Sequence, residues 1–242
     1  MGAVDIVSGI GTGVAVLLIA SQVPVMLEVW RGKRAMNDSS PWPTLGQAAN
    51  FFAWCVYGLE QGDPNVLRVN VIGAAFSLGY AAMFARYSSG AARRTFWQLV
   101  GGFVVIQGLF FGGALGIPGL STETRVTILG YWAVGANVCM YAFPLDALRL
   151  ALKSMDPGAI PLLLTSAGMA CSATWLTYGL LVSNWFVAGP NFAGVGLNFI
   201  QLCIAAYINL YAVKGKRTRL GSASEGATDE EYARLPTATD LN

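Results

Sequence analysis

Histidine is absent from this chain of 242 residues, and only 12% of the residues are charged. Soluble domains carry about 25% charged residues, so this composition argues against a soluble domain. Because histidine is missing and all four cysteines lie inside apolar stretches, the sequence offers neither a zinc-ligand pattern nor a disulfide framework. A net charge of +2 gives nucleic-acid binding no electrostatic basis. We therefore expect no metal, no cofactor and no nucleic-acid partner.

The apolar stretches also lack acids and bases near their centres. An enzyme inside a membrane needs paired acids, a histidine or an activated nucleophile, and Ser166 and Ser172 have no base partner visible in the sequence. A retinal protein needs a membrane-embedded lysine, whereas all four lysines fall in predicted loops or in the tail. The sequence therefore argues against an enzyme and against a retinal protein.

Long apolar runs are what the chain does contain, and 55% of its residues are hydrophobic. Each run is near the twenty or so residues needed to cross the hydrocarbon core. Isolated spans must be helical, because open strand edges would leave backbone groups unpaired in lipid. We predict an all-α membrane protein with seven transmembrane helices, at residues 5–29, 42–60, 66–87, 96–116, 126–150, 159–181 and 186–212.

Basic residues predict how the spans are oriented, because lysine and arginine concentrate in cytosolic loops. They follow spans 1, 3, 5 and 7, at Arg31, Lys33, Arg34, Arg86, Arg93, Arg94, Arg149, Lys153, Lys214, Lys216, Arg217 and Arg219. The opposite side has only Arg68 and Arg125. We expect an extracellular or lumenal N-terminus and a cytosolic C-terminus, and of the plasma and vacuolar membranes we favour the former.

An internal repeat divides the chain. The motif from Trp54 to Gly58 recurs from Trp175 to Gly179, and Asn70 recurs as Asn191, all offset by 121 residues. Two three-helix repeats of the same orientation need one extra crossing between them, which span 4 supplies; a G-protein-coupled receptor would not be expected to repeat in this way. The glycines of span 4 suggest close packing. We divide the chain into a first repeat, a linker helix, a second repeat and a disordered cytosolic tail, at residues 1–90, 91–120, 121–212 and 213–242.

The repeated motifs resemble those of the SWEET sugar transporters over residues 5–212. The motifs are Pro24, Pro43, Trp54-x-x-Tyr57-Gly58 and Asn70-x-x-Gly73, then Tyr141-Ala142-Phe143-Pro144-Leu145, Pro161, Trp175-x-x-Tyr178-Gly179, Pro190-Asn191-x-x-Gly194 and Gln201-Leu202. The resemblance implies a 3+1+3 parallel-repeat arrangement and passive sugar flux by alternating access. It also implies that the paired asparagines contact sugar hydroxyls, that the paired tryptophans flank the ring and that four prolines act as hinges. The residues one turn before each tryptophan, Asn50 and Cys171, would line the cavity.

The chemistry of the paired residues agrees with those roles and leaves structural alternatives open. An asparagine amide can both donate to and accept from a sugar hydroxyl, but it can also join two helices. The tryptophans could stack on a sugar or anchor at the interface, although their depth favours the site. Tyr57 and Tyr178 suit an aromatic belt or an outer gate. Leu17 and Asn137, each seven residues before the first proline of its half, could line the cavity, and Asn137 could instead bond a neighbouring helix.

The prolines differ in what their positions predict. Pro24 and Pro144 lie inside apolar runs, where each removes a helix hydrogen bond and bends the axis, either as a static kink or as a hinge. Pro43 and Pro161 lie near helix starts, where proline costs little, so their hinge role rests on the resemblance. Asp146 departs from the family pattern, which has serine there, and could be a gating or capping carboxylate.

The expected function is a bidirectional sugar uniporter. The central membrane zone contains no Asp, Glu, Lys, Arg or His, and a proton-coupled carrier would need a titratable group that reaches the path. Asn50 and Cys171 are expected to narrow the cavity relative to serine, which favours monosaccharides such as glucose. The alternatives are sucrose transport, proton coupling through Asp146, or a scaffold of the same fold that transports nothing. The expected partners are a small sugar, the lipid bilayer and, from the resemblance, further copies of the chain.

Overall fold

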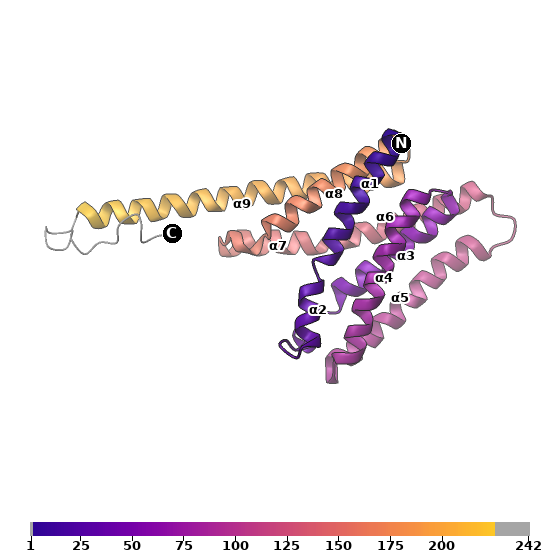
Figure 1. The fold of residues 1–242 in the computed structure, drawn as a ribbon, viewed down its shortest axis with the longest axis horizontal. Helices are drawn as coiled ribbons and strands as arrows, with labels where there is room; N and C mark the ends of the chain where they lie inside the picture. The colour runs from indigo at the N-terminus through magenta and orange to yellow at the C-terminus, as the bar shows by residue number, and fades with distance from the viewer. Residues whose placement is uncertain (1, 226–242) are drawn as a thin grey trace.

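The computed structural model describes residues 2–225, and it is helical throughout apart from short connections (Figure 1). The first predicted span comprises α1 (Ala3–Ala20) and α2 (Val23–Trp30), and the fifth comprises α6 (Thr122–Met140) and α7 (Ala142–Ser154). The other elements are η1 (Met36–Asp38), α3 (Trp42–Gln61), α4 (Pro64–Tyr87), α5 (Gly90–Gly116), η2 (Pro157–Ala159), α8 (Leu162–Leu181) and α9 (Trp185–Glu225). Each predicted span therefore has a helical counterpart.

The C-terminal end differs from the prediction of a disordered tail beginning at residue 213. Helix α9 continues to Glu225, because leucine, lysine and arginine in this stretch are good helix formers and no proline interrupts them. The rest of the predicted tail, residues 226–242, lies outside the described residues.

Two spans are broken where the sequence predicts a bend. Pro24 is the second residue of α2, and Pro144 is the third residue of α7. A proline has no N–H for the helix ladder, so Pro24 and Pro144 each remove one backbone hydrogen bond from their span. The helix is interrupted at Ser21 and Gln22 in the first repeat and at Tyr141 in the second. These interruptions divide each repeat's first span into two segments.

The helix hairpins α3–α4 and α8–α9 are closed by matching caps. Asp63 precedes Pro64, the first residue of α4, and its carboxylate accepts hydrogen bonds from the backbone N–H groups of Asn65 and Val66 at 3.0 and 3.1 Å. Asn184 precedes α9, and its side-chain oxygen accepts from the N–H of Val187 at 3.3 Å. Both hairpins therefore start their second helix from a capping residue, and the two capping residues are 121 positions apart.

Contacts between the repeats pair α1 with α8 and α3 with α6. Within the repeats, α2 packs on α4 and α7 packs on α9, while α5 packs on α3 and α6. In Figure 1 the two groups of helices meet at the end that holds the N-terminus and splay apart towards the ends of α2 and α7. We call these the N-terminal end and the splayed end of the bundle.

Five of the seven spans within the described residues are long and apolar enough to cross a membrane by composition alone. The two that are not, α3 and α8, lie in the contacts between the repeats. Their inward faces carry polar and small residues such as Asn50, Thr165 and Ser172, which lowers their hydropathy. The composition of these two helices therefore reflects their position inside the bundle.

Glycines allow close helix contacts in both repeats. A Cβ at Gly58 would lie 2.9 Å from the backbone nitrogen of Leu67, and one at Gly179 would lie 2.7 Å from that of Ala188. The expectation that the glycines of span 4 pack closely is wrong. Added Cβ atoms would meet nothing within 4 Å on α5 at Gly101, Gly102, Gly108, Gly112, Gly113 and Gly116. Helix α5 instead packs through larger residues such as Phe96 and Gln107.

Candidate functional site

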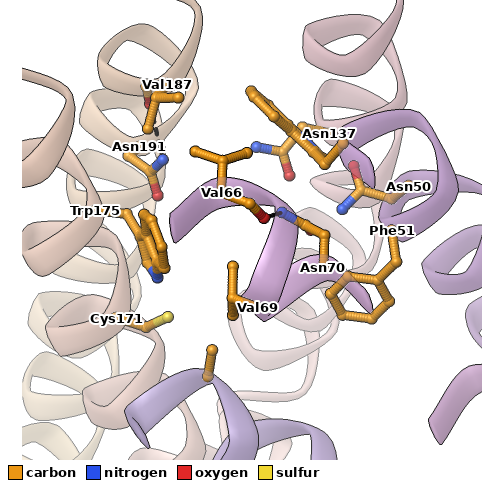
Figure 2. Close-up of a pocket in the computed structure, with 12 residues that line it drawn as sticks. Asn50, Phe51, Val66, Val69, Asn70, Asn137, Cys171, Trp175, Val187 and Asn191 are labelled. Carbon is orange, nitrogen blue, oxygen red and sulfur yellow. Dashed lines mark hydrogen bonds between the residues drawn. The ribbon is translucent and has the colours of Figure 1, made fainter. Parts of the chain in front are cut away.

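A small cavity of about 160 Å³ lies between the two repeats, and residues of both line it. Figure 2 shows its polar side chains converging from several helices. The lining residues are Ala15, Asn50, Phe51, Trp54, Val66, Val69, Asn70, Asn137, Cys171, Trp175, Val187 and Asn191. Seven of the eight substrate-contact residues predicted from the sequence therefore lie together.

Leu17 is the exception, and the prediction that it lines this cavity is wrong. Its side chain is 72% exposed and does not line the cavity, where α1 contributes Ala15 instead. Residues two positions apart on an α-helix, such as Ala15 and Leu17, are separated by about 200° around the axis, so both cannot face the same space. The seven-residue spacing before the proline identified the helix correctly but not its inward face.

Asn70 and Asn191 are held in the same way in their two repeats. The amide N–H of Asn70 donates to the carbonyl oxygen of Val66 at 2.7 Å, and that of Asn191 donates to Val187 at 2.8 Å. Each bond orients the amide along its own helix. The amide oxygen and the second N–H are then the groups that each side chain can offer to a ligand, as acceptor and donor.

Trp54 and Trp175 contribute two indole rings to the lining. Their side chains are only 6% and 7% exposed. Each indole packs edge-to-face against a tyrosine one turn further along its helix, with ring centroids 5.4 Å apart for Trp54 and Tyr57 and 5.2 Å apart for Trp175 and Tyr178. The tyrosines therefore fix the tryptophan rings from the side nearer the N-terminal end.

The same tyrosines close the N-terminal end by crossed bonds between the repeats. The hydroxyl of Tyr57 donates to Oδ1 of Asn184 at 2.9 Å, and that of Tyr178 donates to Oδ1 of Asp63 at 2.7 Å. Both tyrosines line a second hollow of about 540 Å³ beyond this layer, and neither lines the central cavity. The tyrosine layer thus separates the two spaces.

Sequence reasoning missed Asp63 and Asn184, although a signal was present. Both precede the last helix of a repeat and both lie five residues after a glycine of the repeated motif, Gly58 or Gly179. The offset of 121 residues also relates them. A short polar residue at such a place predicts a helix cap; its second role, as the acceptor for a tyrosine of the other repeat, needed the fold.

Asn50 gives the cavity an unmatched acceptor. Its amide oxygen is buried and has no hydrogen-bond partner among the described residues. A buried acceptor without a donor costs about 1–3 kcal/mol, which a ligand hydroxyl reaching the cavity could offset. The equivalent position in the second repeat is Cys171, so this acceptor is present on one side only.

Gln107 is a second residue that sequence reasoning missed. It is buried in α5, donates from Nε2 to the carbonyl oxygen of Ala49 at 2.8 Å and accepts a bond from the indole N–H of Trp132. These bonds tie the linker helix to α3 and α6 beside the cavity. The signal available was an amide inside the apolar run from residue 99 to residue 116.

The predicted hinge and gate residues lie outside the cavity lining. Pro43 is the second residue of α3, and Pro161 is the N-cap of α8, both near helix starts as the sequence predicts. Asp146 is exposed on α7, two residues after Pro144, and forms no ion pair within the described residues. Its predicted role in gating stays a prediction.

A helical bundle of two three-helix repeats joined by a linker helix, with a cavity between the repeats that asparagines from both repeats line, is the architecture of a membrane transporter. A sequence model of the family described as "Sugar efflux transporter for intercellular exchange" matches residues 5–92 and 127–214. The chain belongs to this family, and it is accordingly a multi-pass integral membrane protein and not an enzyme.

Individual relatives agree with that assignment. The chain is 29% identical over 213 residues to the bidirectional sugar transporter SWEET4 of Oryza sativa subsp. indica, covering 87% of this chain and 79% of the relative. It is 30% identical over 200 residues to the bidirectional sugar transporter SWEET1b of the same subspecies, covering 81% of this chain and 76% of the relative. A solved eukaryotic SWEET transporter has the same fold, with a TM-score of 0.74, 25% identity and coverage of 85% of this chain and 96% of that one. This match confirms the predicted 3+1+3 arrangement.

Proposed function

We propose that the protein is a bidirectional, facilitative sugar carrier that binds one sugar between its repeats and works by alternating access. The observation that carries the proposal is the cavity in which Asn70, Asn191, Trp54 and Trp175 converge. Amides that both donate and accept suit sugar hydroxyls, and indole faces suit the apolar face of a sugar ring. The relatives' names, which describe bidirectional sugar transporters, support the same activity.

The substrate class that we propose is a monosaccharide such as glucose. A cavity of about 160 Å³ has the volume of about five liquid waters, at about 30 Å³ each, which favours one sugar ring over two. The bulk of Asn50 and Cys171 in the lining, and the unmatched acceptor of Asn50, support a small substrate rich in hydroxyls. Sucrose is the alternative substrate.

Alternating access is supported by the unequal ends of the bundle. The N-terminal end is closed by the tyrosine layer and by an ion pair of 2.6 Å between Arg125 and Glu60, whereas the opposite end is splayed. With the proposed extracellular or lumenal N-terminus, this state opens towards the cytosol. We propose that Pro24, Pro43, Pro144 and Pro161 change angle when the ends exchange roles, with the repeats at residues 1–90 and 121–212 as the moving parts.

Passive transport is the mode that we propose. Asp, Glu, Lys, Arg and His are all absent from the cavity lining within the described part of the chain, and a proton-coupled carrier needs such a group on its path. Proton coupling through Asp146 is the alternative. We further propose the plasma membrane as the location and, from the family resemblance, self-association as the assembly.

The test is uptake of radiolabelled glucose and sucrose into liposomes that contain the purified protein, without any ion gradient. We expect saturable glucose uptake that is lost in Asn70→Ala and Asn191→Ala. The matched control is Asn198→Ala, because Asn198 lies on α9, donates to the carbonyl of Gly194 at 2.8 Å in the same way, and does not line the cavity.

Each other outcome contradicts a stated part of the proposal. Uptake that starts only when a pH gradient is imposed excludes the uniporter, and Asp146→Asn then becomes the next variant. Equal loss in Asn198→Ala would mean that the asparagines support the fold instead of binding sugar. No flux under either condition would favour the non-transporting scaffold.

A further inference from the structure

Each kink is held by a buried side chain from the third helix of its own repeat. In the first repeat, the hydroxyl of Tyr80 on α4 donates to the carbonyl oxygen of Ile19 at 2.8 Å, just before the interruption between α1 and α2. In the second repeat, Nε2 of Gln201 on α9 donates to the carbonyl oxygen of Pro144 at 2.9 Å. Tyr80 is 5% exposed and Gln201 is 3% exposed.

Tyr80 and Gln201 occupy equivalent positions despite their different chemistry. They are 121 residues apart, and each follows the cavity asparagine of its helix by ten residues. Ten residues span about 15 Å of α-helix. Each third helix therefore carries a ligand-facing amide near its middle and, nearly three turns further towards the splayed end, a hydrogen-bond donor aimed at the kink. The shared property is the donor, which a tyrosine hydroxyl and a glutamine amide supply equally.

Both accepting carbonyls lie close to the break in their span, because Ile19 is two residues before the interruption at Ser21 and Pro144 is three residues after the one at Tyr141. The backbone donor to Ile19 at the interruption is Gln22, at a long 3.4 Å, so the Tyr80 hydroxyl is its closer partner. A carbonyl without a partner at membrane depth is costly, because lipid offers no donor. The carbonyl of Pro144 belongs to the hinge residue itself, so the Gln201 bond joins the turning point of α7 directly to α9.

We propose that Tyr80 and Gln201 couple the cavity to the kinks, by fixing the angle between each repeat's first span and the helix that carries its cavity asparagine. Both bonds are formed in the splayed state, and turning the span at the kink would move the carbonyl away from its donor. The bonds therefore stabilise the splayed state over the state in which that end is closed. This inference rests on the proposed alternating-access function, and it assigns these two residues a positioning role without contact to the sugar.

The test measures the width of the splayed end without sugar. Spin labels are placed at Arg31→Cys, directly after α2, and at Ser154→Cys, the last residue of α7, after the four native cysteines are replaced by serine. Distances between the labels are then measured by double electron–electron resonance in nanodiscs. Tyr80→Phe removes only the hydroxyl, and Gln201→Met keeps the side-chain length but removes the donor.

We expect each variant to increase the ratio of short to long distances by roughly threefold to tenfold, because one net hydrogen bond contributes about that factor. The matched controls are Tyr207→Phe, an exposed tyrosine further along α9, and Gln98→Met, an exposed glutamine on α5. Neither control should shift the distances. Thermal unfolding of every variant is measured alongside, so that a population shift is read only on folded protein.

Unchanged distances in both Tyr80→Phe and Gln201→Met would overturn the inference, as would equal shifts in the controls. If the folded fraction of Gln201→Met falls, Tyr80→Phe decides the result, because it removes a single oxygen atom. The measurement needs no sugar, so it separates the two proposals. Shifted distances without sugar flux would leave the coupling standing and remove the sugar function. Sugar flux with unshifted distances would support the sugar function and overturn the coupling.

Discussion

The two repeats share most of their framework but differ at one position of the cavity lining, at the acceptors of the tyrosine layer and at the donors to the kinks. Tryptophan, tyrosine, glycine and the cavity asparagine are the same at each equivalent position. Around them, Asn50 corresponds to Cys171, Asp63 corresponds to Asn184, and Tyr80 corresponds to Gln201. The shared residues hold the close helix contacts and frame the cavity. The unlike pairs make the two sides chemically different, so the pseudo-symmetric carrier has an asymmetric site and gate.

The largest expected effect comes from breaking the shared framework. In Gly58→Ala the new Cβ would lie 2.9 Å from the backbone of Leu67, and in Gly179→Ala it would lie 2.7 Å from the backbone of Ala188. Backbone atoms cannot move aside as a flexible side chain can, so we expect a loss of roughly 3 kcal/mol or more of stability in each variant. Thermal unfolding in detergent measures it. Gly79→Ala inside α4, where the added Cβ meets nothing within 4 Å, is the control and should lose no stability, because alanine favours a helix over glycine.

The next effect distinguishes the two halves of the tyrosine layer. Tyr178→Phe removes one of the three donors to the carboxylate of Asp63, whereas Tyr57→Phe removes one of the two donors to the neutral amide oxygen of Asn184. Hydrogen bonds to charged groups contribute about 1.5–3 kcal/mol, compared with about 0.5–1.5 kcal/mol for neutral pairs. We therefore expect Tyr178→Phe to open the N-terminal end more than Tyr57→Phe does. The measurement is the rate at which a water-soluble thiol reagent reacts with Cys171 in the cavity lining, with the other three cysteines replaced, and a faster reaction indicates a more open end.

Asp63→Asn would make the two gate acceptors alike and should reduce the difference between the tyrosine variants. Tyr131→Phe is the control, because Tyr131 is 69% exposed and does not line the hollow at the gate. Equal effects of Tyr57→Phe and Tyr178→Phe in the presence of Asp63 would contradict the argument from charge.

A smaller effect follows from removing the difference within the cavity. Asn50→Ser together with Cys171→Ser gives both repeats the same small residue, widens the space and removes the unmatched amide oxygen. We expect the ratio of sucrose to glucose uptake to rise by up to about tenfold, which corresponds to about 1.4 kcal/mol. Competition between the two labelled sugars in liposomes measures the ratio. An unchanged ratio would show that these two positions do not limit substrate size.

The smallest effect concerns the ion pair between Arg125 and Glu60, which has no counterpart because position 181 of the second repeat is leucine. Both side chains are partly exposed, at 32% and 20%, so solvent and salt screen the attraction. We expect Glu60→Gln to cost at most about 1 kcal/mol of stability, less at high salt. Unfolding at low and high ionic strength tests this, and a large loss that does not depend on salt would contradict it.

Much of the site could be predicted from the sequence, because its information is local and repeated. The offset of 121 residues identified Asn70 with Asn191 and Trp54 with Trp175, and the family resemblance indicated Asn50, one turn before Trp54. The interruptions beside Pro24 and Pro144 follow from the missing N–H of proline, which acts on neighbouring residues. The helical content likewise follows from lipid, which requires the backbone bonds to be satisfied inside each span.

Only the tertiary structure decided which residues meet across the bundle. Tyr57 and Asn184 are 127 residues apart, and Tyr178 and Asp63 are 115 apart, so no local pattern predicts their bonds. The inward face of α1, with Ala15 in place of Leu17, depended on how that helix is rotated against α8. The relative placement of helices likewise decided that α5 packs through Gln107 and not through its glycines. It also decided that Tyr80 and Gln201 bond to the kinks. Residue type and spacing fix which group a side chain offers, but its partner is set by the packing of segments that are distant in the chain.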